Sequence, residues 1–410
     1  MLRNAVMLLM LAVLVGCQST SSIKPLTEID IEQAEHAEDI AKLRQDSEWL
    51  HEEFKRKGLL YRDKDSNEYI RSLAQKLAPE LKSNGATINI YLVRNATPNA
   101  IALPNGDIYV FSGLMALVQN QDQLASIVAH EIGHVVHQHG LKSAINRRNT
   151  VVTAHITNIF LFGTGLAYLP AGASLASFSR DMEQEADQLS LQYLHNAGFD
   201  VRQSPAVFER FSTLPKSNSI AGSIYSSHPD NQERINYLNE KIQIEFDQPN
   251  FLQPSEQFEK TRARMVELNV KLRLRAKQYQ MALKLLDEAE DYYNQQDKIT
   301  YYRGEVYRLM ADNPEAAAKE HAWLQERRMR EEDKKLYEQK IAEYRNKARN
   351  LFLTIRESEK APKEMFRGLG MLCKQQGDVE HAKLYLQAYL DQPTPPKDRL
   401  YIQHQLEQLN

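Results

Sequence analysis

Apolar residues recur with helical spacing between residues 124 and 136 of the chain. They are Leu124, Val128, Ile132, Val135 and Val136. This spacing predicts one helix with an apolar stripe, and Asp122 stands where a helix-capping residue is expected. Two histidines, His130 and His134, fall on the opposite side of that helix, one turn apart. The pattern therefore predicts a helix that presents two imidazoles on one face.

A second helical pattern covers residues 179–198 and ends at Gly198, where a helix C-cap would lie. Its apolar or small positions are Met182, Ala186, Leu189, Tyr193 and Ala197. Glu183 and Asp187 are spaced i and i+4, so they share one face of this helix, whereas Glu185 points elsewhere. The second helix is thus predicted to present a pair of carboxylates.

The remaining patterns place a small sheet among helices. Residues 29–57 and 66–81 read as helices, and alternation of apolar and polar residues predicts strands at 87–93 and 106–111. Helices dominate the chain after these strands. The expected fold is mainly α with a small β-sheet, in a domain that covers residues 29–248.

From about residue 254 the composition shifts to charged, alanine-bearing helices with few glycines, which predicts a second, all-α domain at residues 254–410. Ala282 and Ala316 lie one tetratricopeptide period apart. The last unit places several residues at the spacings of that repeat: Phe366, Leu369, Gly370, Gly377, Ala382, Leu386 and Pro393. A generic helical bundle is the alternative. Stacked helix pairs would form a concave surface for binding proteins.

The first helix carries the motif H-E-x-x-H at residues 130–134. Two imidazoles one turn apart can bind one Zn²⁺, and Glu131 beside them can take a proton from water. A catalytic zinc site needs a third protein ligand, for which Glu183 is the candidate, with Asp187 as the acceptor that orients a ligating histidine. A solvated helix face is the alternative for both carboxylates. His137 also lies near the ligand face, so the residue pattern leaves open which histidines bind.

Four segments together carry a family resemblance. "HEIGH" and "SRDMEQEAD" are preceded by "NAIALPNGDIYVFSGL" and followed by "SSHPDNQERI". In this order they resemble the zinc metallopeptidases related to HtpX and the CAAX prenyl proteases, and most closely the soluble periplasmic branch that includes BepA. The resemblance covers roughly residues 59–238. It implies a gluzincin fold with one Zn²⁺ per chain, His130, His134 and Glu183 as metal ligands, and Glu131 as the general base.

The resemblance has two further implications for the site. Residues 99–110 should form an edge strand and hairpin, in which Asn99 and Ala100 lie on the strand that pairs with an extended substrate. His228, directly before Pro229, should be able to occupy the open zinc position and inhibit the enzyme. The alternative for His228 is a surface or capping histidine at the start of a helix. Arg234 in that helix could stabilise an oxyanion or form a plain salt bridge, and the salt bridge is preferred.

The N-terminal sequence is typical of an exported lipoprotein. A basic Arg3 precedes an apolar run at residues 5–15 that is too short to span a bilayer, which predicts a signal peptide at residues 1–16. "LVGC" resembles a bacterial lipobox, so Cys17 would be lipidated and residues 17–28 would form a tether. Gln18 after the cysteine is typical of transport to the outer membrane. These features predict a protein anchored to the outer membrane that faces the periplasm, with Cys373 as the remaining thiol.

Residues 149–179 contain no Asp, Glu, Lys or Arg and are long enough for one membrane span. Glycines, a proline and scattered polar residues interrupt it. A lid or packed hairpin over the site is therefore preferred to a membrane span.

Composition narrows the function. Lys and Arg number 51 and Asp and Glu 54, so the net charge of −3 gives no indication of a nucleic-acid partner. The sequence favours a zinc endopeptidase that degrades misfolded or misassembled envelope proteins, with the helical domain recruiting these clients or partners such as the outer-membrane assembly machinery. The alternative is a chaperone or assembly scaffold with little or latent protease activity. The intact Glu131 favours the enzyme.

Overall fold

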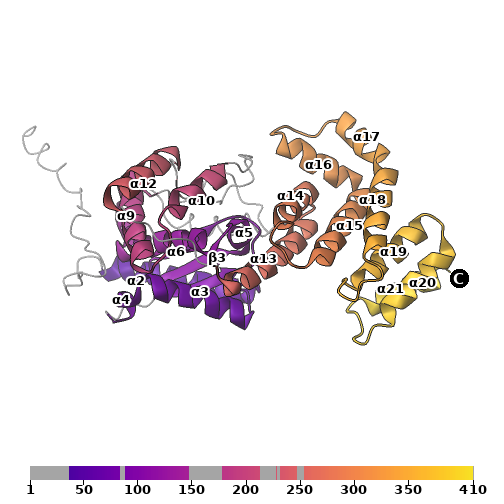
Figure 1. Cartoon of the computed structure of the whole chain (residues 1–410), viewed down its shortest axis with the longest axis horizontal. Helices are drawn as coiled ribbons and strands as arrows, with labels where there is room; N and C mark the ends of the chain where they lie inside the picture. The colour runs from indigo at the N-terminus through magenta and orange to yellow at the C-terminus, as the bar shows by residue number, and fades with distance from the viewer. Residues whose placement is uncertain are drawn as a thin grey trace, which may run out of the picture. The chain divides into compact units, whose positions relative to one another are not determined.

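The computed structural model describes residues 37–83, 88–146, 178–212, 228, 231–246 and 254–409. The described residues divide into two compact units, one up to Thr261 and one from Arg262 onwards. The expected mainly α fold with a small sheet is confirmed (Figure 1). The predicted signal peptide, tether and most of the uncharged segment lie outside the described residues. Within the described part of the chain, no helix is both long and apolar enough to cross a membrane.

The sheet of the first unit has three strands, β1 (Asn89–Val93), β2 (Ala100–Ala102) and β3 (Asp107–Phe111). Their order is β1-β3-β2, with β1 parallel and β2 antiparallel to the central strand. Every residue of β3 is buried, as expected for a central strand. Both predicted strands are therefore confirmed, and β2 is the edge strand of a hairpin with β3.

Three helices precede the sheet in the described part of the chain: α2 (Ala37–Arg56), α3 (Lys64–Leu77) and α4 (Pro79–Ser83). The end of α2 packs on the sheet in an apolar cluster that contains Leu50, Phe54, Val93, Leu103, Tyr109 and Phe111. The single helix expected at residues 66–81 is two helices, α3 and α4. They separate at Ala78, because a residue before proline is sterically disfavoured in the helical conformation, and Ala78 has φ −133° and ψ 67°.

The histidine-bearing helix is α6 (Gln121–Val136), which follows the short α5 (Ser112–Leu117). The expected cap was wrong, because Asn120 and not Asp122 accepts a hydrogen bond from the Gln123 N–H. Asp122 lies in the first turn, is buried, and accepts the Asp200 N–H at 2.8 Å. It ties the start of α6 to the loop after the carboxylate helix.

Four further helices follow α6 among the described residues of the first unit. These are α7 (His139–Asn146), α9 (Arg180–Asn196), α10 (Gln203–Ser212) and α12 (Asn231–Glu245). Helices α6 and α9 pack closely at Gly133, where an added Cβ would lie 3.0 Å from the Cα and the carbonyl oxygen of Ala186. The missing side chain thus allows the H-E-x-x-H motif to lie directly against the turn of α9 that holds Glu183.

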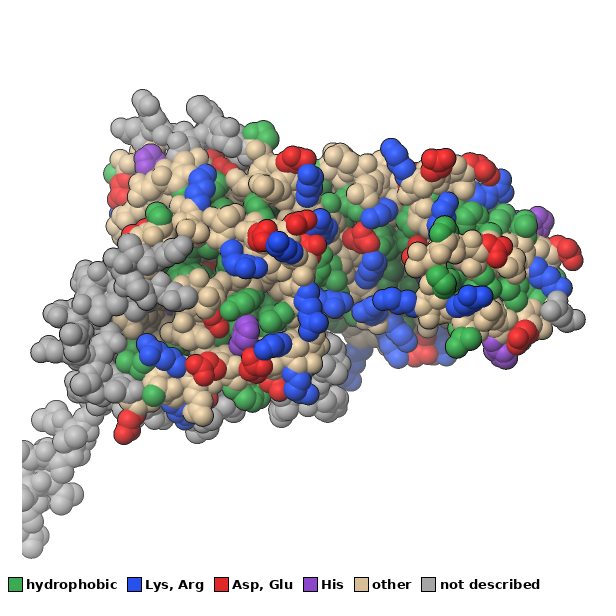
Figure 2. All heavy atoms as spheres, turned by 90° about the horizontal axis from the view of Figure 1, so that it is seen from below, with side chains coloured by type: hydrophobic (Ala, Val, Ile, Leu, Met, Phe, Trp, Pro, Cys, Tyr) green, Lys and Arg blue, Asp and Glu red, His purple; other side chains and the backbone are tan. Residues whose placement is uncertain are grey.

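From Glu256 the described chain is helical. The helices are α13 (Glu256–Arg275), α14 (Tyr279–Ala289), α15 (Gln296–Asp312), α16 (Pro314–Leu324), α17 (Glu331–Gln339), α18 (Ile341–Thr354), α19 (Glu364–Gln375), α20 (Val379–Leu390) and α21 (Arg399–Glu407). Figure 2 shows acidic and basic side chains interspersed over one face of the molecule. This mixture is typical of a solvated surface.

Small residues permit close helix packing in the second unit. A Cβ added to Gly370 of α19 would lie 2.6 Å from Leu386 Cδ2 of α20, so these two helices form a tight hairpin. The Phe352 ring of α18 lies between Gly304 and Gly368, which belong to α15 and α19. Paired helices are compatible with the predicted repeats, and the tetratricopeptide assignment stays a prediction, as do the predicted domain limits.

Candidate metal centre

Four buried side chains from three parts of the first unit converge on one point. His130 and His134 come from one face of α6, Glu183 from the first turn of α9, and His228 from the chain before α12. One nitrogen or oxygen of each residue lies within 4.8 Å of the others. The structure therefore brings together the three predicted ligands and the predicted inhibitory histidine.

The spacing of the four donor atoms suits one small ion. The Nε2 atom of His130 lies 2.9 Å from His134 Nε2 and 3.3 Å from His228 Nδ1. Oxygens of Glu183 lie 3.4 Å from His130 Nε2, 3.7 Å from His134 Nε2 and 2.9 Å from His228 Nδ1. Tetrahedral zinc with bonds of about 2.0–2.1 Å places its donors roughly 3.3–3.4 Å apart. Two imidazoles, a carboxylate and a third imidazole fit such an ion in both chemistry and spacing.

Asp187 and Arg234 contact the side of the cluster that faces away from the four converging donor atoms. Asp187 Oδ1 lies 2.9 Å from His130 Nδ1, the nitrogen that faces away from the other donors. Arg234 donates two hydrogen bonds to Asp187, from Nη2 at 2.7 Å and from Nε at 2.9 Å. Its Nη1 forms an ion pair with Glu183 at 3.0 Å. The side chain of Arg234 is only 4% exposed, so this arrangement is a buried salt bridge rather than a group that faces open solvent.

Glu131 lies beside the cluster and is 1% exposed. Its Oε1 has no hydrogen-bond partner among the described residues and lies 3.4 Å from His228 Nε2. A buried carboxylate oxygen without a donor is costly, so such an atom usually marks a place for a water, an ion or a reacting group. Glu131 is thus placed to accept a proton next to the four donors.

Among the described residues, the carboxylates of the centre outnumber its permanently charged cations. Three buried carboxylates, those of Glu131, Glu183 and Asp187, face the single guanidinium of Arg234. Burial opposes ionisation of Glu183, but the imidazoles of His228, His130 and His134 hold its pKa well below the usual range. The excess negative charge matches a divalent cation, because a buried charge must be paired.

The imidazoles respond differently to this field. Burial and the nearby His130 hold the pKa of His134 well below its usual value, so this ring is neutral, as a metal ligand must be. Burial also lowers the pKa of His228, but Glu183 and Glu131 outweigh it and raise the value to about 9. The negative charges of Glu183 and Glu131 can therefore be compensated either by a proton on His228 or by a divalent cation bound among the four donors.

Sequence analysis missed two neighbours of His134. His139 is fully buried, and its Nδ1 lies 2.8 Å from His134 Nδ1. The Phe178 ring stacks on the His134 ring with centroids 4.0 Å apart. The only available signal was the fourth histidine of "SIVAHEIGHVVHQHG", but helical spacing could not place a residue that follows the end of α6.

The predicted substrate strand lies at the sheet edge next to α6. Asn99 and Ala100 are both buried, and the Asn99 carbonyl accepts the Phe111 N–H at 2.9 Å. Asn99 Oδ1 accepts the Ala100 N–H, also at 2.9 Å. Among the described strands β2 pairs only with β3, so its other edge has no strand partner.

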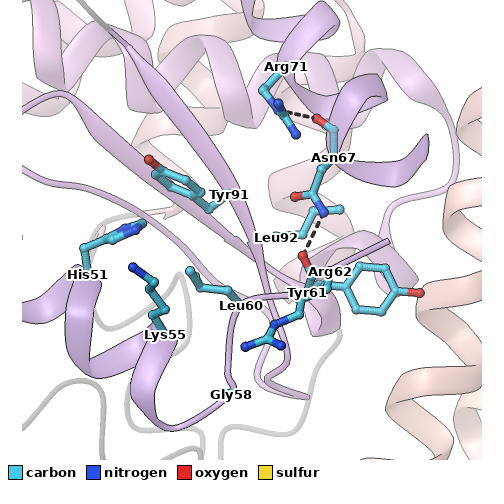
Figure 3. A pocket seen from close by; sticks show the side chains of 10 residues that line it. All are labelled: His51, Lys55, Gly58, Leu60, Tyr61, Arg62, Asn67, Arg71, Tyr91 and Leu92. Atoms are coloured by element: carbon cyan, nitrogen blue, oxygen red, sulfur yellow. Dashed lines mark hydrogen bonds between the residues drawn. The ribbon is translucent and has the colours of Figure 1, made fainter. Parts of the chain in front are cut away.

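A separate cavity of about 440 Å³ lies between the end of α2, the start of α3 and β1 (Figure 3). The basic residues that line it are Lys55, Arg62 and Arg71, and Tyr91 forms one wall. None of the four donor residues belongs to this cavity. It is therefore distinct from the metal centre.

Comparison with known proteins agrees with this geometry. The mitochondrial metalloendopeptidase OMA1 of Schizosaccharomyces pombe is 32% identical over 153 residues, 37% of this chain and 45% of the relative. The beta-barrel assembly-enhancing protease of Escherichia coli K12 is 27% identical over 210 residues, which are 48% and 42% of the two chains. Metalloprotease YcaL of the same organism is 29% identical over 185 residues, 43% of this chain and 71% of the relative. The aligned regions thus span less than half of the first two relatives.

The match to a protein family falls on the same part of the chain. The model of peptidase family M48 matches residues 64–242, the region from the start of α3 to near the end of α12. This region contains all four donors, Glu131 and the sheet. The resemblance found in the sequence is therefore confirmed for residues 64–242, which form a domain similar to peptidase family M48.

Proposed function

We propose that the chain is a zinc-dependent endopeptidase of the bacterial cell envelope that hydrolyses misfolded or misassembled envelope proteins. The observation that carries the proposal is the buried set of four donors with Glu131 beside it. A purely structural zinc site would gain nothing from a buried carboxylate oxygen that has no hydrogen-bond partner among the described residues. Two of the similar proteins are named as a metalloendopeptidase and a metalloprotease, which supports the same reaction.

The residues have distinct roles in this proposal. His130, His134 and Glu183 would hold the zinc ion, which when bound polarises the peptide carbonyl and lowers the pKa of the attacking water. Glu131 accepts a proton from that water at Oε1 and returns it to the leaving amine. Asp187 accepts a hydrogen bond from His130 Nδ1, keeps the ring in one tautomer, and is itself fixed by Arg234.

Strand β2 is the proposed docking edge for the substrate. An extended peptide could pair with its free edge by main-chain hydrogen bonds, which require no particular side chains. Such recognition suits unfolded clients, because only an unfolded segment can lie extended along a strand. Asn99, directly before β2, and Ala100, its first residue, would align the peptide beside α6.

Removal of the metal tests the proposal directly. Treatment of the full chain with a chelator should abolish cleavage of an unfolded protein such as casein, because no side chain of the site can polarise the peptide carbonyl in place of the metal. Stoichiometric Zn²⁺ should restore cleavage. Metal content and cleavage are measured on the same samples. Cleavage that persists in the metal-free protein would refute the zinc mechanism, and zinc binding without any cleavage would favour the scaffold described below.

His228 is the proposed inhibitory ligand. Its ring lies between the base and the cluster, with Nε2 3.4 Å from Glu131 and Nδ1 2.9 Å from Glu183. An imidazole in this position takes the space that the attacking water needs. We propose that substrate or a partner withdraws His228, which would protect correctly folded neighbours from cleavage.

The His228→Ala variant should retain zinc and cleave faster, including self-cleavage. A minor open state of such an equilibrium is typically about 0.1–10% populated, so the gain should be at least about tenfold. Initial rates on an unfolded substrate measure it, and His195→Ala, an exposed histidine of α9, is the matched control. An unchanged or lower rate would make His228 a structural or catalytic residue instead.

The helical region is proposed to recruit clients or partners, including the outer-membrane assembly machinery. Paired helices such as α19 and α20 have outer faces that do not contact each other. One apolar side chain on such a face, Leu384 of α20, is 61% exposed. The second candidate function is a chaperone or assembly scaffold with latent protease activity. The imidazole of His228 within the cluster is the observation that favours latency.

The lipid anchor is a further part of the proposal. Cys17→Ser should release the protein from membranes into the soluble periplasmic fraction, because each buried CH₂ of an acyl chain contributes about 0.8 kcal/mol and the substituted chain would carry none. Fractionation followed by immunoblotting measures the release. If the variant still sediments with the outer membrane, Cys17 is not the anchor.

A further inference from the structure

His139 links the metal centre to the protein surface. Gln138 adopts a left-handed conformation with φ 54° directly after α6, which turns the chain so that α7 begins at His139. The His139 side chain is fully buried although the turn itself lies near the surface. Its two ring nitrogens have separate partners, His134 Nδ1 at 2.8 Å and Glu185 Oε2 at 2.9 Å.

The row formed by His134, His139 and Glu185 has defined proton positions if His134 is a metal ligand. Its Nε2 faces the other donors, so a ligating His134 offers the lone pair of Nε2 and carries its proton on Nδ1. That proton can be donated only if His139 Nδ1 is an acceptor. The His139 proton then lies on Nε2 and is donated to the carboxylate of Glu185. One set of tautomers satisfies every contact in the row.

We propose that His139 and Glu185 form a positioning relay that fixes the ring orientation and tautomer of His134. The relay does for His134 what Asp187 does for His130, but through an intervening imidazole. It ends at Glu185, whose side chain is 48% exposed and lies 3.8 Å from Lys142 Nζ. This inference rests on the proposed metal centre, and it assigns a function to the acidic residue of α9 that points away from the donors.

A second metal ion bound by His137, His139 and Glu185 is the competing interpretation, because these three residues also bring ligand atoms together. Such an ion would take the lone pair of His139 Nε2 and leave the proton on Nδ1. Two N–H groups would then face each other across the 2.8 Å between His139 and His134. Lys142 beside Glu185 also repels a cation. The relay is therefore preferred.

Zinc affinity of the full chain, measured by competition with a chromophoric chelator, tests the relay without any need for activity. His139→Ala should weaken zinc binding by about 10–100-fold, the usual effect of removing a residue that orients a ligand. His139→Asn should retain most of the affinity, because Asn Oδ1 can take the place of the acceptor Nδ1. The control is His137→Ala, whose ring stacks on His139 with centroids 5.4 Å apart but is outside the relay.

The possible outcomes separate the hypotheses. Unchanged zinc affinity in a folded His139→Ala variant would overturn the relay while leaving the metal centre in place. If His139→Ala does not fold, a loss of zinc affinity of about tenfold or more in a folded His139→Asn variant would overturn the acceptor role. A fall from two zinc ions to one in His137→Ala would establish the second metal site instead. A wild-type chain that binds no zinc would refute the proposed function itself.

Discussion

The Glu131→Gln variant should lose cleavage by about 10²–10⁴-fold while it keeps its zinc, because general-base catalysis commonly contributes that factor. The amide of glutamine has nearly the shape of the carboxylate but cannot accept the proton of the attacking water at neutral pH. Glu131 is not one of the four converging donors, so its loss should leave their spacing intact. The measurement pairs the cleavage rate of an unfolded substrate with the zinc content of the same preparation.

Glu209→Gln is the matched control for this variant, since Glu209 lies on α10 in the same unit and is exposed. It should cleave at the wild-type rate. Wild-type cleavage by Glu131→Gln would show that another residue is the base. Loss of zinc together with cleavage would show that Glu131 itself holds the metal.

The second large effect is expected from the ligands. His130→Ala, His134→Ala and Glu183→Ala should each weaken zinc binding by about a hundred- to a thousand-fold. A four-ligand zinc site in peptides binds with about 10–16 kcal/mol, so one donor accounts for about 3 kcal/mol or more. Glu183→Ala also removes the ion-pair partner that lies 3.0 Å from Arg234.

Glu185→Ala is the control for the choice of carboxylate, because Glu185 lies on the same helix and touches the centre only through His139. Its effect on zinc affinity should be smaller than that of Glu183→Ala. If Glu183→Ala binds zinc normally and Glu185→Ala does not, the metal is held by the other carboxylate. Chelator competition at fixed pH ranks the variants.

Local sequence was sufficient to predict each half of the site. Helical spacing placed His130 and His134 on one face of α6 and put Glu183 and Asp187 together on α9. Alternation predicted two of the strands. These predictions succeeded because side-chain direction within a helix or strand depends on backbone geometry that repeats over a few residues. The exceptions were at helix ends, where Asn120 replaced Asp122 as the cap and Pro79 divided a helix.

The meeting of these faces is a property of the tertiary structure. The periodicity of apolar residues does not single out Gly133. Its missing side chain nevertheless allows α6 to approach Ala186 and brings the histidines close to Glu183. His228 and His139 reach the cluster from outside both predicted helices. The sequence by itself thus determined which residues share a face, since that depends on local periodicity. Only the packed structure decided which faces meet, because contacts between distant segments depend on shape and burial across the whole domain.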